Sequence, residues 1–258
     1  MKVRTLLLAI ALTLLPFPAM GQIPAAQGGT LGFYRYPALH GDLIVFAAEG
    51  DLWRVSTEGG VAHRLTTHAA EETDPVISPD GSTIAFTARY EGPTELYTMP
   101  IEGGLPVRRT YESDPSRATT WTPDGRVVYA TRHYSTLPQW QLVALDLPTQ
   151  ARERIPLETA SEGAYDDSGR TLFFVRPAFH GNVTKRYTGG TARDVWKFEQ
   201  GASEAVELTG DYEGESHSPM YWQGRVYFVS DRDGTMNLWS MTSDGGDVRQ
   251  HPATQGGT

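Results

Sequence analysis

The sequence predicts an all-β fold, a β-propeller built from four-stranded antiparallel blades. Two observations carry this prediction: a Pro-Asp-Gly type of turn between apolar, β-rich runs recurs along the chain, and a second short strand-like run follows each copy. A third is that no window shows a convincing amphipathic helical period. A repeat of 40 to 55 residues is typical of propeller blades, and it separates the turn glycines Gly41, Gly81, Gly125, Gly169 and Gly224.

The stretch DPVISPDGSTIAFTAR, from Asp74 to Arg89, shows why each copy should form a hairpin. Pro79 presets φ at the second turn position, Asp80 can bond nearby backbone groups, and Gly81 supplies the positive φ that closes the hairpin. The run that follows is apolar and β-branched without strict alternation, which is typical of a strand covered on both faces. We therefore interpret Asp80 as a turn residue rather than a catalytic carboxylate.

Each unit continues with a loop, a third strand, a Gly-Gly type of turn and a fourth short run. The third strands are expected at DLWRV, ELYTM, QLVAL, DVWKF and NLWSM, which begin at Asp51, Glu95, Gln141, Asp194 and Asn237. Such units cannot bury both faces alone, and radial stacking lets them bury one another's faces. An open sandwich is the structural alternative, against which the regular four-strand repeat argues. The five expected blades span approximately residues 33–72, 73–116, 117–160, 161–215 and 216–258.

Residues 1–21 are predicted to be a secretory signal peptide, followed by a linker over residues 22–32. Two basic residues precede the apolar run from Leu6 to Leu15, which is too short to span a bilayer as a helix. The small residues of Ala19-Met20-Gly21 fit a cleavage site. An uncleaved signal anchor is the alternative. We expect an exported protein, periplasmic if the source has two membranes and not membrane-bound once the signal is removed.

The fourth unit carries an insertion, PAFHGNVTKRYTGGTARDVW, between its second and third strands. Long connections in repeat arrays often bear function, and a solvated loop is the alternative. The sequence ends at Thr258, after the fifth unit. Because propellers need closure to cover their edge strands, we expect that a sixth blade is missing and that the chain is truncated. A five-unit array closed by its N-terminal segment is the alternative.

The composition excludes several kinds of chemistry. The chain has no cysteine and a formal net charge of −9, so a Cys nucleophile and Cys-ligated metals are excluded, and nucleic acid is an unexpected partner. We expect no cofactor, no metal and no catalytic residue, because the common nucleophile, zinc and phosphate-binding motifs are missing. GESHS, with Ser216 and His217, is interpreted as the entry to a strand. DRDGTMN, from Asp231 to Asn237, departs from the spacing of a calcium loop and is interpreted as a hairpin turn.

The hairpin repeat resembles the one shared by TolB, the tricorn proteases and the propellers of prolyl oligopeptidase-type enzymes. Three stretches narrow this further: GDLWRVSTEGGVAHRLTTH from Gly50, KRYTGGTARDVWKF from Lys185 and VYFVSDRDGTMNLWSM from Val226. They look like the N-terminal propeller of tricorn protease and its bacterial homologues, over roughly Phe33 to Thr254.

The resemblance implies a six-bladed propeller at the start of a serine peptidase that degrades oligopeptides and forms large homo-oligomers. It places the catalytic residues in a downstream part of the same protein and makes the propeller a route or filter for peptides. It also implies a basic loop that holds a peptide's C-terminal carboxylate, since Arg can donate to a carboxylate in bidentate fashion. The best match is Arg132 with His133, after the strand RVVYATRHY; a solvated loop is the alternative.

Three functions remain open at this point. The chain can be the propeller of an exported tricorn-type peptidase that gates or guides peptides. It can be a stand-alone TolB-like module that binds proteins. It can also be the propeller of a prolyl-oligopeptidase-type enzyme.

Overall fold

The computed structural model describes residues 32–177 and 187–252. The predicted signal peptide and nearly all of the linker lie outside these residues. Within them, every regular element is a strand, and none is a membrane-spanning helix. The fold prediction is confirmed: Phe33–Thr258 is one compact unit, and its strands form five antiparallel four-stranded sheets.

The strands of each sheet follow one another in sequence order. The first blade holds β1 (Arg35–His40), β2 (Leu43–Ala48), β3 (Asp51–Ser56) and β4 (His63–Arg64). The second holds β5 (Glu72–Ile77), β6 (Thr83–Ala88), β7 (Glu95–Pro100) and β8 (Val107–Arg108). The third holds β9 (Ser116–Trp121), β10 (Val127–Thr131), β11 (Gln141–Leu145) and β12 (Arg152–Arg154). The fourth holds β13 (Ser161–Tyr165), β14 (Thr171–Arg176), β15 (Asp194–Glu199) and β16 (Val206–Glu207). The fifth holds β17 (Ser216–Trp222), β18 (Arg225–Ser230), β19 (Asn237–Thr242) and β20 (Arg249–Gln250).

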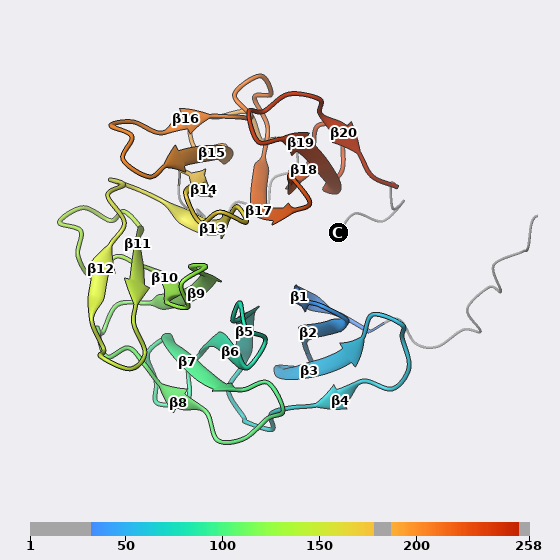
Figure 1. Ribbon diagram of the computed structural model, residues 1–258, viewed down its shortest axis with the longest axis vertical. Coiled ribbons are helices and arrows are strands. Elements are labelled where there is room, and N and C mark those ends of the chain that lie inside the picture. The colour runs from blue at the N-terminus through green and yellow to red at the C-terminus, as the bar shows by residue number, and fades with distance from the viewer. Residues whose placement is uncertain (1–31, 178–186, 253–258) are drawn as a thin grey trace, which may run out of the picture. The chain divides into compact units, whose positions relative to one another are not determined.

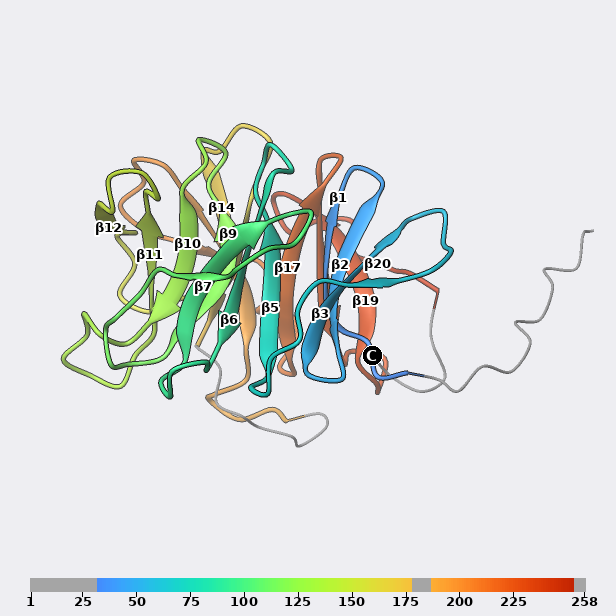
Figure 2. The same ribbon diagram turned by 90° about the horizontal axis from the view of Figure 1, so that it is seen from below.

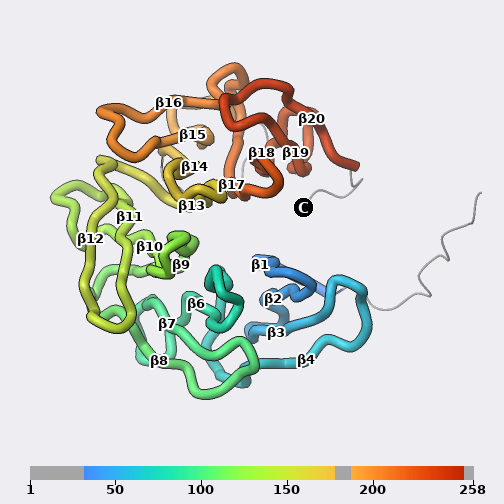
Figure 3. Tube along the Cα trace, viewed as in Figure 1, coloured from blue at the N-terminus to red at the C-terminus, as the bar shows by residue number. Residues whose placement is uncertain are grey.

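The blades stand side by side around a common axis, with the first strand of each blade innermost (Figure 1). Strand β5 packs against β1 and β9, and β13 packs against β9 and β17. Turned by 90°, the innermost strands are seen to run along the axis (Figure 2). The tube trace shows that the arc is open between the first and fifth blades (Figure 3).

The core lies between blades rather than inside a single layer. Four apolar clusters join successive pairs of blades, and their largest fully buried members are aromatic: Phe86, Tyr129, Phe173, Phe174 and Phe228. The central strands of the second, third and fourth blades are therefore covered on both faces, which explains their unbroken apolar sequences.

The recurring turn forms as the sequence predicts. The Gly81 N–H donates to the Ser78 carbonyl (2.8 Å) with Gly81 at φ +71°, and Asp80 Oδ1 accepts from Ser78 Oγ (2.6 Å) and Ser82 N (3.0 Å). Asp80 is thus a turn residue, as predicted. These hydrogen bonds favour the ionised carboxyl and lower its pKa to about 2.

A buried threonine after the fourth strand ties that edge to the third strand in three blades. Thr110 Oγ1 accepts from the Leu96 N–H (2.9 Å) and donates to Glu95. Thr209 Oγ1 accepts from the Val195 N–H (3.0 Å) and donates to Asp194 (2.8 Å). We call this arrangement the threonine clasp; Thr66 forms it in the first blade with the Leu52 N–H and Glu72. The buried carboxylates of Glu72, Glu95 and Asp194 therefore have a structural role in these clasps.

Candidate functional site

The innermost strands carry an irregularity close to the axis. In four blades the ladder between the first two strands shifts register, and one residue at the shift takes a left-handed φ: Tyr36 (52°), Asp74 (51°), Glu162 (47°) and Ser218 (53°). In the third blade the shift leaves Thr119 unpaired without a positive φ. A left-handed conformation costs a non-glycine residue roughly 1 kcal/mol or more, and bulges of this kind re-aim side chains. Because these strained residues recur in four blades, the innermost strands near the axis are a candidate site.

Charged groups from blades that are not neighbours act on one another here. Burial raises the pKa of Asp74, a hydrogen bond from Thr73 and the charge of Arg117 lower it, and Glu162 raises it. Burial likewise raises the pKa of the Tyr36 hydroxyl, with Asp74 raising it further and Arg117 lowering it. Tyr36 and Arg117 belong to the first and third blades, and Asp74 and Glu162 to the second and fourth. Asp74 therefore interacts electrostatically with groups from three other blades, and we call these four residues the axial cluster.

Glu162 is held in place by Arg193 of its own blade and by Ser218 of the next. Its carboxylate accepts from the Ser218 N–H (2.6 Å) and from Arg193 Nη1 (3.2 Å), and Arg193 Nε also donates to Glu215 (2.7 Å). The side chain of Arg193 is nearly buried, so these charge-assisted bonds fix the acidic side of the cluster.

Ser216 and His217 open β17, as predicted from the sequence. His217 Nδ1 lies 2.9 Å from Ser218 Oγ, but none of its hydrogen bonds within the described part of the chain is to a carboxylate. Burial lowers the pKa of His217 to about 4, with Arg193 acting in the same direction, so the ring is neutral at pH 7. A catalytic serine needs a base that a third group orients. This contact is therefore a packing contact beside the axial cluster.

Arg132 and His133 lie in the loop after β10, and the structure gives both residues partners from the chain itself. Arg132 Nη2 lies 3.4 Å from Asp114 Oδ1, while its Nε is buried without a hydrogen-bond partner. His133 Nδ1 lies 3.1 Å from the Glu112 carbonyl. Their role in holding a peptide carboxylate stays a prediction.

Trp140 connects Arg132 to the axial cluster. The guanidinium carbons of Arg132 and Arg117 lie 5.5 and 5.4 Å from the centroid of the Trp140 ring. Such contacts favour a cation over an aromatic face. Arg117 on β9 and Arg132 in the loop after β10 thus both contact the Trp140 ring. Sequence reasoning missed Arg117 because it is separated from Arg132 along the chain, and only the pairing of β9 with β10 brings the two together.

The segment Asp231–Asn237 forms the hairpin turn expected between two strands, β18 and β19. Asp231 Oδ1 accepts from the Glu215 N–H and from the Tyr212 hydroxyl, both at 3.0 Å. Asp233 accepts from Asn237 Nδ2 (2.9 Å). The aspartates therefore stabilise the turn and the strand beside it. The insertion of the fourth blade lies between β14 and β15, and its residues 178–186 lie outside the described residues.

Fold and site together define a β-propeller with a charged axial cluster, and among the described residues no oriented serine–histidine pair accompanies it. The chain belongs to the family described as the tricorn protease N-terminal beta propeller domain, whose family model matches residues 31–257.

Known proteins agree with this assignment. The chain is similar to tricorn protease homolog 1 of Streptomyces coelicolor, with 32% identity over 89% of this chain and 22% of that protein. Its fold is similar to the crystal structure of the tricorn protease, with a TM-score of 0.77 at 23% identity over 87% of this chain and 23% of that one. A putative TolB from Agrobacterium tumefaciens shares the fold with a TM-score of 0.69, at 21% identity over 85% of this chain and 80% of that one. The chain spans about a fifth of the length of the first curated relatives it matches.

Proposed function

We propose that this chain is the propeller portion of an exported tricorn-type serine peptidase that degrades oligopeptides, and that the propeller guides peptide substrate or product along its axis. The family supports the peptidase, and the basic and apolar N-terminal residues support export. The peptidase domains would belong to the same protein, which we expect to assemble as a homo-oligomer. The chain itself would bind peptides without cleaving them.

One observation carries the guiding role: Arg117 and Arg132 share the Trp140 ring beside the axial carboxylates. A guanidinium group presents paired N–H donors that match a carboxylate. The buried Nε of Arg132 has no acceptor among the described residues, and the contact from Nη2 of the same side chain to Asp114 is long at 3.4 Å. A peptide's C-terminal carboxylate would supply the missing acceptor, while Asp74 and Glu162 on the neighbouring blades would attract its cationic groups.

The test measures binding of a fluorescent tetrapeptide with a free C-terminus and of the same peptide as its C-terminal amide. We expect the amide, and the variants R132Q and R117Q with the free peptide, to bind about tenfold more weakly, because a charge-assisted hydrogen bond is lost. R89Q is the matched control, since Arg89 follows β6 as Arg132 follows β10.

Equal binding of the acid and the amide would contradict the carboxylate role. Cleavage of a fluorogenic oligopeptide by the purified chain would contradict the placement of catalysis outside it. Export is checked separately by the N-terminal sequence of the protein recovered from the periplasm, which we expect to begin at Gln22.

A further inference from the structure

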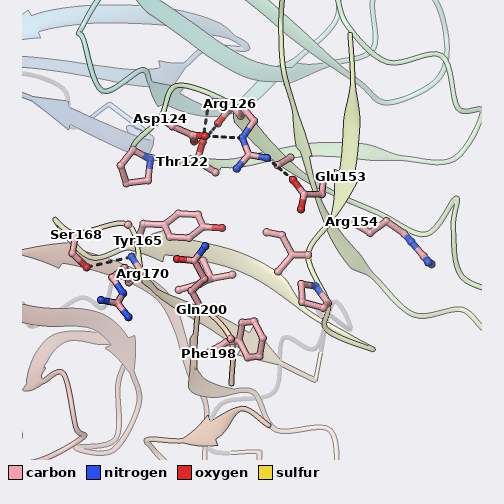
Figure 4. A pocket seen from close by; sticks show the side chains of 17 residues that line it. Thr122, Asp124, Arg126, Glu153, Arg154, Tyr165, Ser168, Arg170, Phe198 and Gln200 are labelled. Atoms are coloured by element: carbon pink, nitrogen blue, oxygen red, sulfur yellow. Dashed lines mark hydrogen bonds and ion pairs between the residues drawn. The ribbon is translucent and has the colours of Figure 1, made fainter. Parts of the chain in front are cut away.

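A cavity of about 390 Å³ lies between the third and fourth blades, away from the axial cluster (Figure 4). Its walls come from the turn at Thr122 and strand β12 on one side, and from β13 with the turn at Gly169 on the other. None of the axial cluster residues lines it, nor does Arg132. Its size falls within the usual range for small-molecule sites.

Two side chains explain why this interface is hollow. Tyr165 ends β13 at the position where Trp121 ends β9, each four residues before its turn glycine. Trp121 is almost fully buried between the second and third blades and donates to the Val76 carbonyl (3.1 Å). Ala144 on β11 occupies the position of Arg54 on β3, which reaches Glu102 of the next blade (2.5 Å). At the hollow interface Tyr165 is smaller than Trp121 between the second and third blades, and Ala144 is smaller than Arg54 between the first and second.

Both acidic groups of the cavity are paired with the same arginine. Arg126 forms ion pairs with Asp124 (3.1 Å) and with Glu153 (2.6 Å) on the wall of the third blade. Figure 4 shows this three-residue network at one side of the cavity. The whole lining has two carboxylates, Asp124 and Glu153, against three arginines, so its formal charge does not favour a cation.

Three hydrogen-bond donors of the lining remain available to a ligand. Within residues 32–177 and 187–252, the Tyr165 hydroxyl bonds to no other group, and the guanidinium groups of Arg154 and Arg170 form no ion pair. Burial raises the pKa of Tyr165 to about 12, so its hydroxyl keeps its proton at neutral pH. Arg154 and Arg170 lie on either side of the cavity, with Tyr165 and Gln200 between them (Figure 4).

Apolar side chains form the rest of the lining. Ile155 and Pro156 contribute from the third blade, and Leu172 and Phe198 from the fourth. Such surfaces favour a compact apolar body, since burying it removes its area from water.

We propose that this cavity binds a small organic anion, a carboxylate carried on a compact apolar body such as an aromatic ring. The ring lies against the apolar walls, the carboxylate accepts from the Tyr165 hydroxyl, and the two arginines at opposite sides of the cavity supply positive charge. The shared chemistry covers a free aryl carboxylate and the C-terminal phenylalanine of a peptide.

The first experiment compares three ligands of one shape by isothermal titration calorimetry on the purified chain. 3-Phenylpropionate is the anion, 3-phenylpropionamide the neutral analogue and 2-phenylethylamine a cation. We expect the anion to bind about tenfold more tightly than the amide, and the amine more weakly than both. Equal binding of the anion and the amide, or no binding of the anion up to its solubility limit, overturns the proposal.

The second experiment uses variants that fill the cavity or remove the charges of two of its arginines. Tyr165→Trp reproduces the side chain that closes the neighbouring interface, so we expect it to abolish binding while the melting temperature is kept or raised. The double variant R154Q/R170Q should weaken binding of the anion about tenfold and leave the amide unchanged. Arg89→Gln is the matched surface control. Unchanged binding in Tyr165→Trp places the ligand elsewhere and overturns the assignment.

A third arm distinguishes the two sources of the carboxylate. Acetyl-glycyl-phenylalanine carries the same ring and acid on a peptide. Tighter binding than 3-phenylpropionate, lost in Tyr165→Trp, identifies a peptide end as the ligand; weaker binding identifies a free carboxylate. Because Arg132→Gln leaves this cavity intact, its effect on peptide binding separates the axial proposal from this one.

Discussion

Asp194, the first residue of β15, connects a single ionisation to the stability of a blade. Burial raises its pKa to about 6; the hydrogen bond from Thr209 opposes the rise, and the negative charges of Glu207 and Glu215 add to it. The folded protein therefore binds a proton more tightly at this site than the unfolded chain does.

The sign of the pH effect follows from this difference. Between the unfolded pKa near 3.8 and the folded pKa of about 6, the native state holds more protons, so the free energy of unfolding decreases as the pH rises through this window. Asp194→Asn keeps an oxygen acceptor for Thr209 and removes the titration. We expect urea unfolding of this variant to depend less on pH between 4.5 and 7 than that of the parent. An unchanged slope would contradict the assignment.

Residue-level predictions succeeded where the chemistry was local. Asp80 was predictable as a turn residue because Pro79 and Gly81 fix the same turn on either side of it. Arg117 was not predictable as a site residue, because its partner Trp140 lies on a connection of the same blade that only strand pairing brings close. The left-handed Asp74 escaped prediction for the same reason, since a bulge is a property of two strands.

At the scale of the element, the threonine clasp shows how a very short fourth strand is retained. Strands β4, β8, β16 and β20 have two residues each, too few for a ladder that holds by itself. The clasp adds a buried bond to the third strand just beyond this short ladder. In the second blade, removing the hydroxyl leaves the buried Leu96 N–H without its acceptor, while Glu95 loses one donor and keeps its ion pair with Arg108.

We expect Thr110→Val to lower the free energy of unfolding by about 1–3 kcal/mol, because the buried Leu96 N–H loses its acceptor and Glu95 loses one of its donors while the volume is kept. Thr57→Val is the matched control, since Thr57 is exposed and its hydroxyl makes no hydrogen bond to a described residue. Urea titrations of the two variants provide the comparison. A loss in Thr57→Val as large as that in Thr110→Val would show that the clasp contributes nothing of its own.

The third strands were predictable as elements: all five begin at the expected residues, Asp51, Glu95, Gln141, Asp194 and Asn237. Each combines a polar first residue with an apolar centre, and this pattern needs no knowledge of the neighbouring blade. The inter-blade cavity was not predictable, because it depends on which side chain of one blade faces which side chain of the next.

At the scale of the whole propeller, the first and fifth blades expose apolar side chains that the other blades bury. Leu39 on β1 is 63% exposed and Trp222 on β17 is 57% exposed. Isolated exposed apolar residues are ordinary, but residues on the innermost strands of the two end blades form surfaces that favour association.

We expect the chain to bind a hydrophobic dye such as ANS and to self-associate as its concentration rises. The double variant L39K/W222K should reduce both effects, because charged side chains oppose burial of these surfaces. Leu105→Lys is the control, since Leu105 is even more exposed (89%) but lies on an outer turn. Dye fluorescence and sedimentation velocity give the readouts, and an equal decrease in the control would contradict the role of the end blades.

The hollow between the third and fourth blades has a consequence for how this architecture acquires new specificities. Each interface uses the same pair of structural positions: Ile77 with Arg54 between the first and second blades, Trp121 with Thr98 between the second and third, and Tyr165 with Ala144 at the open cavity. Neither position lies in a turn or in a threonine clasp, so the exchange leaves the repeat's framework untouched. Each inter-blade interface of such a propeller can therefore be closed or opened by changing the side chains at these two positions. Replacing Trp121 with Tyr and Thr98 with Ala would open a second cavity between the second and third blades.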